Sequence, residues 1–186
     1  MGTRFRYVAD DALRAENPDW YPECHVCDAV GTVYPMRATV RLGDGQTEDI
    51  SAVCESCLNT GINIEYEFNF KENVLKYFKR DSSNEDPKTL MLQALERLAH
   101  NPRPAKCVQG FDWPLCCNDF CEFLGSPANA EAYEAFRIDA RFWVGGPAGK
   151  HLSRNFLVEG PPELWTEVSF FRCSHCGKKH YIDQYT

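Results

Sequence analysis

Hydrophobic and polar residues alternate over several short stretches of the chain, and this period predicts β-strands. From residue 62 to residue 70 every second side chain is apolar, which is typical of a half-buried strand, although a short helix is a competing prediction. A Gly-Asp-Gly run at 43–45 predicts the turn of a hairpin. The other expected strands are residues 32–34, 38–42, 168–171 and 180–185.

Two helices are predicted from their capping residues and from the spacing of their apolar side chains. Asp86 as N-cap and Pro87 at the first helical position open one helix, which ends before Pro102. Ser126 as N-cap and Pro127 open the other, and a Gly-Gly-Pro run ends it. The residues expected to face inward are Leu90, Ala94, Leu95, Leu98, Ala130, Tyr133, Phe136 and Ala140.

The composition is that of a globular protein that stays in the compartment where it is made. Of 186 residues, 44% are apolar, 13% aromatic and 25% charged, so a disordered or collagen-like chain is excluded. No apolar run approaches the ~18 residues of a membrane span, and the first residues contain no signal-peptide core. We therefore expect a cytoplasmic protein without membrane contact. Ten cysteines in such a reducing compartment are better explained as metal ligands than as disulfides.

Two Cys-x-x-Cys pairs predict a first zinc site. Cys24, Cys27, Cys54 and Cys57 flank an expected hairpin that would bring the two pairs together. A Cys-x-x-Cys turn places two thiolates on one side of an ion and leaves backbone N–H groups to bond the sulfurs. Four buried free cysteines are the alternative, but the repeated spacing would then be a coincidence.

A third pair, Cys173 and Cys176, needs two more ligands to complete a second zinc site. We expect Cys117 and Cys121 to supply them, because a Cys-x-x-x-Cys spacing places both thiols on one face of a helical turn. Alternative ligands are Cys116, His175 and His180. In the competing interpretation Cys117 and Cys121 pack in the core and the terminal pair is redox-active, but thioredoxin-like chemistry requires a βαβ context that the last residues cannot supply.

Closed four-thiolate sites argue against catalysis, because they leave no coordination position for water or substrate. We therefore expect two structural zinc ions and no enzymatic activity. The chain also contains no His-x-Glu, phosphate-binding glycine loop, Gly-x-Ser-x-Gly or His-Glu-x-x-His motif. A metal-dependent enzyme is the alternative, and its activity would depend on residues such as His25 or Asp119.

Negative charge is concentrated in one segment. The formal net charge is −7, and residues 44–72 contain seven acids and one base. Such a chain repels phosphate backbones, so we expect a basic protein partner and no direct contact with nucleic acid. A solvated face without a partner is the alternative. The expected contact residues are Asp44, Glu48, Asp49, Glu65, Glu67 and Glu72.

The cysteine spacing and a central aromatic run resemble the bacterial CbrC family. The resemblance extends from Cys24 to the C-terminus and includes residues 54–61, 111–125 and 171–178. In the central run the matching positions are Trp113, Cys117, Asp119, Cys121, Phe123, Leu124 and Gly125. Cys116 stands where the family usually has His. The resemblance implies that Cys117 and Cys121 occur together with Cys173 and Cys176, which supports their pairing.

The CbrC family is associated with tolerance to colicin E2, a DNase bacteriocin. The resemblance therefore implies an immunity or tolerance protein that neutralises a bacterial toxin. The expected partner is a nuclease with a basic cleft. The protein would neutralise it by blocking its substrate site. A regulatory or structural zinc-binding adaptor is the alternative.

The expected fold is α+β, with small zinc-ribbon-like β-hairpin modules packed on a few α-helices and stapled by two structural zinc sites. We expect one compact unit with an N-terminal zinc-ribbon-like module at 1–80. A helical part with a C-terminal zinc-knuckle hairpin is expected at 81–186.

Overall fold

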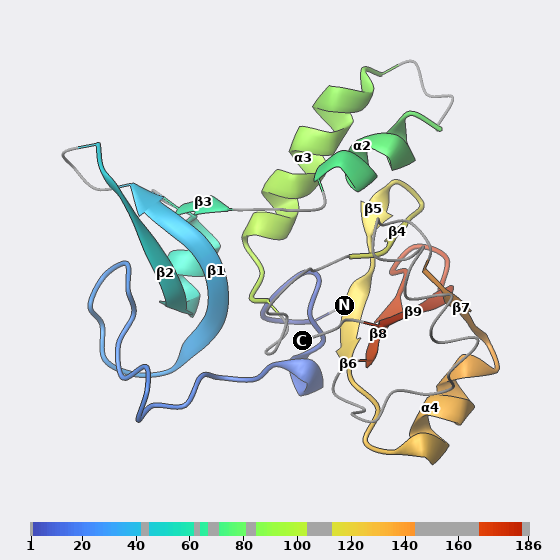
Figure 1. Ribbon diagram of the computed structural model, residues 1–186, viewed down its shortest axis with the longest axis horizontal. Coiled ribbons are helices and arrows are strands. Elements are labelled where there is room, and N and C mark those ends of the chain that lie inside the picture. Colours follow the sequence, from blue (N-terminus) through green and yellow to red (C-terminus); the bar gives the residue numbers. More distant parts are fainter. Residues whose placement is uncertain are drawn as a thin grey trace.

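Two small β-sheets lie on either side of the N-terminal segment in the computed structural model (Figure 1). The structure describes residues 2–41, 45–61, 64–66, 71–80, 85–103, 113–143 and 168–183. In this part of the chain the fold is α+β, as the sequence predicts. Its helices are the 3-10 helix η1 (Asp10–Ala12) and the α-helices α1 (Glu55–Thr60), α2 (Lys71–Phe78), α3 (Pro87–Ala99) and α4 (Ala130–Arg137).

The first sheet has three antiparallel strands in the order β2-β1-β3, namely β1 (Val33–Arg41), β2 (Thr47–Cys54) and β3 (Ile64–Tyr66). The two short strands expected around Pro35 form the single strand β1, because a bulge between Pro35 and Ala38 bends the backbone without ending the pairing. Of the strand expected at 62–70, the structure describes only β3. Its other residues lie outside the described part of the chain, as do residues 43 and 44 of the expected turn.

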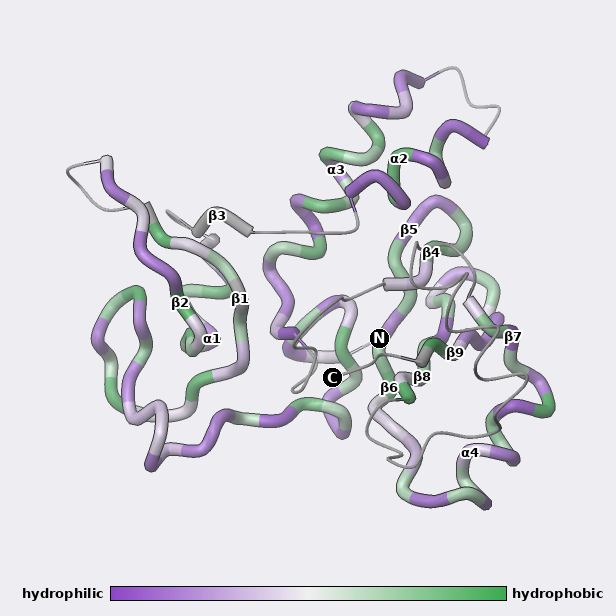
Figure 2. Tube along the Cα trace, viewed as in Figure 1, coloured by the Kyte–Doolittle hydropathy of each residue, from purple (hydrophilic) through white to green (hydrophobic). Residues whose placement is uncertain are grey.

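Helix α3 follows its predicted boundaries, and α2 packs against it. Asp86 caps α3 as expected, and its carboxylate accepts a hydrogen bond of 3.1 Å from the Thr89 backbone N–H. Hydrophobic and hydrophilic positions follow one another along the helix (Figure 2). Its inner side buries Ala94, Leu95 and Leu98. None of the described helices has the length and apolar character needed to cross a bilayer.

The second sheet has the strand order β6-β8-β9-β7, with β7 (Ala140–Phe142) parallel to β9 (Lys179–Asp183) and the other pairs antiparallel. The strands β6 (Glu122–Gly125) and β8 (Val168–Arg172) pair at its other edge. A separate hairpin, β4 (Leu115–Cys116) and β5 (Asp119–Phe120), precedes β6. The predicted strands near the C-terminus are therefore confirmed within the described residues.

The predicted start of the second helix is wrong. Helix α4 begins at Ala130, and its N-cap is Asn129, whose side chain accepts a hydrogen bond of 2.9 Å from Ala132 N–H. Asn129 is an effective cap in the extended conformation that precedes a helix, so it replaces Ser126 in this role. Ala140, expected inside this helix, belongs to β7.

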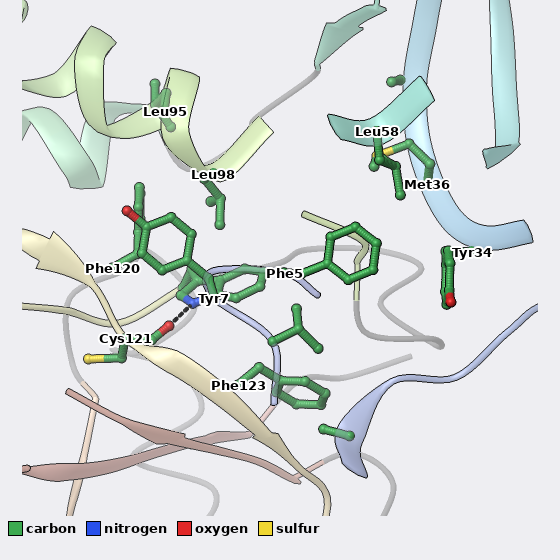
Figure 3. Close-up of a cluster of buried hydrophobic side chains, with 14 of the residues drawn as sticks. Phe5, Tyr7, Tyr34, Met36, Leu58, Leu95, Leu98, Phe120, Cys121 and Phe123 are labelled. Atoms are coloured by element: carbon green, nitrogen blue, oxygen red, sulfur yellow. Dashed lines mark hydrogen bonds between the residues drawn. The ribbon is translucent and has the colours of Figure 1, made fainter. Parts of the chain in front are cut away.

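One cluster of buried side chains joins the two sheets. It includes Val33 and Ile50 of the first sheet, Phe123 and Phe171 of the second, and Phe5 of the N-terminal segment. Figure 3 shows Phe5 and Phe123 in this cluster. A smaller cluster lies under α4, where the rings of Phe136 and Phe170 stack with centroids 3.9 Å apart. The shared core positions both sheets relative to each other, and with them the cysteine clusters at their edges.

Candidate metal centres

The first predicted cysteine tetrad is assembled in the structure. The sulfurs of Cys24, Cys27, Cys54 and Cys57 all lie within 4.8 Å of one another. Cys24 is fully buried, whereas Cys27 is exposed. Cys27 Sγ and Cys54 Sγ are 3.8 Å apart, which is also the sulfur–sulfur distance of about 3.8 Å expected for a tetrahedral zinc with Zn–S bonds of about 2.3 Å.

The two pairs of the first tetrad come from different local structures. In the first pair the backbone turns back, with Asp28 N–H donating to Cys24 C=O at 2.9 Å and Asp28 in the left-handed region at φ 56°. The second pair lies where β2 ends and α1 begins, with Cys54 as the residue before the helix and Cys57 inside it. The first site therefore consists of one Cys-x-x-Cys turn and the first turn of a helix. The sequence predicted two facing Cys-x-x-Cys turns.

A second tetrad forms between two hairpins, and one of its four cysteines differs from the prediction. The sulfurs of Cys116, Cys117, Cys173 and Cys176 lie within 4.8 Å of one another. Cys116 Sγ is 3.6 Å from Cys176 Sγ and 3.9 Å from Cys117 Sγ. The terminal pair forms a knuckle like that of the first pair, because Gly177 N–H donates to Cys173 C=O at 2.9 Å and Gly177 has φ 73°.

The assignment of Cys121 as a ligand is corrected by the structure. Cys117 and Asn118 have φ of 53° and 60°, so they form the left-handed two-residue turn between β4 and β5. The expected helical turn is absent at this point, and Cys121 lies past the hairpin. Its side chain is fully buried in the core beside Phe120 and Phe123, and burial raises the pKa of its thiol (Figure 3). Cys116, which the sequence left as an alternative, takes its place.

The two histidine alternatives do not join the second tetrad. His175 lies between the two cysteines of the terminal knuckle, but its Nε2 is 3.4 Å from the Asp119 carboxylate. His180 is buried, and its ring forms a T-shaped pair with that of Trp143 at a centroid distance of 5.9 Å. Burial, followed by the charges of Arg141 and Lys178, lowers the pKa of His180. Neither histidine therefore belongs to the group of side chains that could hold an ion at this site.

The ionisation of the thiols fits a bound cation. Burial alone would raise the pKa of Cys24, but hydrogen bonds from the Cys54 and Val26 N–H groups lower it to about 7. The Lys178 N–H lowers the pKa of Cys176 to about 7 in the same way. Burial and the neighbouring thiols raise the pKa of Cys57. Four crowded thiols cannot all ionise without a positive ion between them, and a divalent metal supplies that charge.

Asp119 organises the surroundings of the second tetrad. Its carboxylate is 6% exposed, accepts a 2.5 Å hydrogen bond from the Tyr7 hydroxyl and lies 2.8 Å from the Arg6 guanidinium. The Arg97 guanidinium lies 3.5 Å from the other carboxylate oxygen, Oδ1. Burial opposes ionisation, but Tyr7 and Arg6 hold the pKa of Asp119 below its ordinary value. No sequence signal pointed to these partners, since they come from the N-terminal segment and the end of α3.

The hydrogen bond from Tyr7 supports a mutational prediction. Tyr7 is 1% exposed, and burial followed by the bond to Asp119 raises its pKa to about 12. Tyr7→Phe leaves a buried carboxylate with one donor fewer, so we expect the free energy of unfolding to fall by about 1–3 kcal/mol in chemical denaturation. Tyr21→Phe is the control, with an expected change within about 0.5 kcal/mol. Equal effects of the two variants would contradict the role of the Asp119 network.

The acidic residues expected to contact a partner are distributed over three elements. Glu48 and Asp49 are exposed near the start of β2, and Glu72 is exposed in the first turn of α2. Asp49 pairs with Thr39, which pairs with Glu65, so these residues form one cross-strand row. Two further expected contact residues, Asp44 and Glu67, lie outside the described part of the chain.

Comparison with known proteins places the chain in a family. Searches of curated proteins and of solved structures found no match. One family model matches residues 3–184, a range that includes both tetrads, Asp119 and the N-terminal segment. The chain therefore belongs to the Uncharacterised protein family (UPF0167).

Proposed function

We propose that this protein holds two zinc ions as structural elements, has no catalytic role, and acts by binding and neutralising a protein toxin. The observation that carries the zinc part is the pair of four-thiol clusters. Tetrahedral sets of four sulfurs select zinc or iron–sulfur centres, and zinc bound in this way has no free coordination position. Such ions stabilise a fold and the surface it presents.

Charge and family resemblance support a nuclease as the partner. The CbrC family, which the central run resembles, is associated with tolerance to a DNase bacteriocin. A DNase binds DNA phosphates through basic residues, and a chain with a net charge of −7 complements such a cleft. Electrostatic complementarity of this kind accelerates association and favours the correct partner.

The start of β2 is the part of the acidic segment that we propose as the contact surface. The first half of this strand is hydrophilic (Figure 2). Glu48 and Asp49 are exposed there, and the sequences of β2 and β3 contain no Lys or Arg. Both strands belong to the sheet that ends in the first tetrad, so zinc would hold this surface in a fixed shape.

Co-expression tests the proposal. The chain and the protein encoded by the neighbouring gene are purified together and analysed by native mass spectrometry. A 1:1 complex that abolishes nuclease activity is expected. If the neighbouring protein neither binds nor is inhibited, the toxin proposal is wrong; a stable complex without any inhibition would instead support the adaptor.

Charge reversal tests the surface. Glu48→Lys combined with Asp49→Lys is expected to slow association at low salt by about tenfold or more, because steering raises association rates by roughly 10–1,000-fold. Glu96→Lys combined with Glu131→Lys is the matched control, since it changes the net charge equally at exposed positions of α3 and α4. Equal slowing by both double variants would show a non-specific charge effect and remove β2 from the interface.

A further inference from the structure

Two arginines of the N-terminal segment (residues 3–12), Arg4 and Arg6, bind acidic residues that lie beside the two tetrads in the chain. Arg4 Nε donates to the Glu55 carboxylate at 3.1 Å, and Glu55 lies between the last two ligands of the first tetrad. Arg6 lies 2.8 Å from Asp119, which follows the hairpin ligands of the second tetrad. One short segment therefore contacts residues beside both candidate metal centres.

At the second tetrad the contact continues across the site. Asp119 Oδ2 lies next to both Arg6 and His175 Nε2, at 2.8 and 3.4 Å. His175 belongs to the terminal knuckle, whereas Asp119 belongs to the hairpin that carries Cys116 and Cys117. The N-terminal segment is thus connected to both halves of the second tetrad.

Buried packing holds the segment in place, and the ion pairs of Arg4 and Arg6 connect it to the residues beside the ligands. Arg4 and Arg6 are about half exposed, and exposed ion pairs contribute little to stability. Phe5, Tyr7 and Val8, however, are buried in the core cluster that also contains the ligands Cys24 and Cys173. Figure 3 shows Phe5 and Tyr7 inside this cluster. A displacement of the N-terminal segment would therefore disturb the packing beside both tetrads.

Backbone hydrogen bonds fix the N-terminal segment on the second sheet. Phe123 N–H donates to Tyr7 C=O at 2.8 Å, and Ala9 N–H donates to Phe123 C=O at 2.9 Å. The segment is closed on itself by Asp10, whose carboxylate accepts hydrogen bonds from the Thr3 N–H at 3.0 Å and from the Thr3 hydroxyl at 2.7 Å. The conformation of the N-terminal segment thus depends on β6 and on the groups beside both tetrads.

We propose that the N-terminal segment couples the two metal sites, so that zinc bound at one tetrad raises the affinity of the other. Each ion fixes the loops that contact the segment and so orders the segment. When the second ion binds, the segment is already ordered, so its binding lacks this free-energy cost. By linkage the effect is reciprocal. This inference rests on the proposed binding of two zinc ions. Its consequence is that both zinc ions dissociate together when zinc becomes scarce.

Removing one site while measuring the other tests the coupling. In the full chain, Cys173→Ser with Cys176→Ser disables the second tetrad, and zinc affinity of the first is measured by competition with a chromophoric chelator. We expect the affinity to fall by roughly tenfold, within the usual range of about 5- to 150-fold for coupled sites. The same ligand changes in an Arg4→Gln/Arg6→Gln background are expected to have a clearly smaller effect. An unchanged first-site affinity in the wild-type background overturns the proposal.

A second measurement covers the case in which the ligand variant does not fold. The zinc-loaded wild-type chain is treated with excess EDTA and followed by native mass spectrometry. Coupled sites keep the one-zinc species scarce, and we expect its maximum to be at least threefold higher in Arg4→Gln/Arg6→Gln. Arg14→Gln/Arg137→Gln, with the same charge change, is expected to behave as wild type. Equal maxima in all three proteins overturn the coupling, whereas a chain that binds no zinc overturns the proposed function instead.

Discussion

Replacing Cys24 by serine is expected to release the first metal ion and to lower the melting temperature by about 8–16 °C. A ligand present at 1,000 times its Kd stabilises the folded state by about 4 kcal/mol. For a chain of 186 residues, each kcal/mol shifts the melting temperature by about 2–4 °C. Cys24 is fully buried, and its sulfur accepts hydrogen bonds from the N–H groups of Val26 and Cys54, so the site cannot be repaired locally.

Calorimetry with and without a chelator measures this effect. Chelated wild-type protein should melt at or below the temperature of the Cys24→Ser variant, because it lacks both ions. Ser56→Ala changes an exposed residue between two ligands without removing a thiol, and it should keep both ions and the wild-type melting temperature. If Cys24→Ser melted like wild type in excess zinc, the first site would have no structural role.

Cys116→Ser is expected to remove the second metal, whereas Cys121→Ala is expected to keep it. Cys116 lies 3.6 Å from Cys176 within the tetrad, but Cys121 is buried in the core. Deletion of the Cys121 sulfur removes a group about the size of a methylene, so the free energy of unfolding should fall by only about 1 kcal/mol. Cys116→Ser should cost several times more, because it removes the ion.

Metal analysis of the two purified variants distinguishes the ligand sets. One zinc per chain in Cys116→Ser and two in Cys121→Ala agree with the structure. The reverse result would restore Cys121 as the ligand. Two ions in both variants would mean that neither Cys116 nor Cys121 is needed and that another side chain completes the second site.

The first tetrad could be predicted from the sequence because its information is local. Two repeats of the same four-residue spacing flank one hairpin, and few arrangements of such a hairpin keep the thiols apart. Helix α3 was predictable for a similar reason, since Asp86 and Pro87 act within one turn of its start. In both cases the residues that decide the structure are near neighbours in the chain.

The second tetrad contains Cys116 in place of the predicted Cys121 for a local reason that the cysteine spacing alone does not reveal. A Cys-x-x-x-Cys pair fits a helical turn, but Asn118 tolerates the left-handed conformation and favours a tight hairpin turn. The run Cys-Cys-Asn-Asp was the available signal for this turn, and it would have favoured Cys116 and Cys117. The Asn129 cap was overlooked in the same way, because Ser126 followed by Pro127 has an equally suitable pattern.

The contacts of the N-terminal segment could not be predicted from the sequence. Arg6 and Asp119 are separated by 113 positions, and Arg4 and Glu55 by 51. Nothing in the local pattern of residues 3–12 indicates a partner, because pairing over such distances is decided by how the two sheets pack. These are also the contacts from which the coupling of the two sites is inferred.

The most direct test of the account is X-ray absorption at the zinc edge on purified protein of known metal content. The account predicts two zinc ions per chain and a single shell of four sulfur atoms at about 2.3 Å, with no oxygen or nitrogen ligand. One ion per chain, or a mixed shell with a nitrogen or oxygen at about 2.0 Å, would contradict the two closed four-thiolate sites.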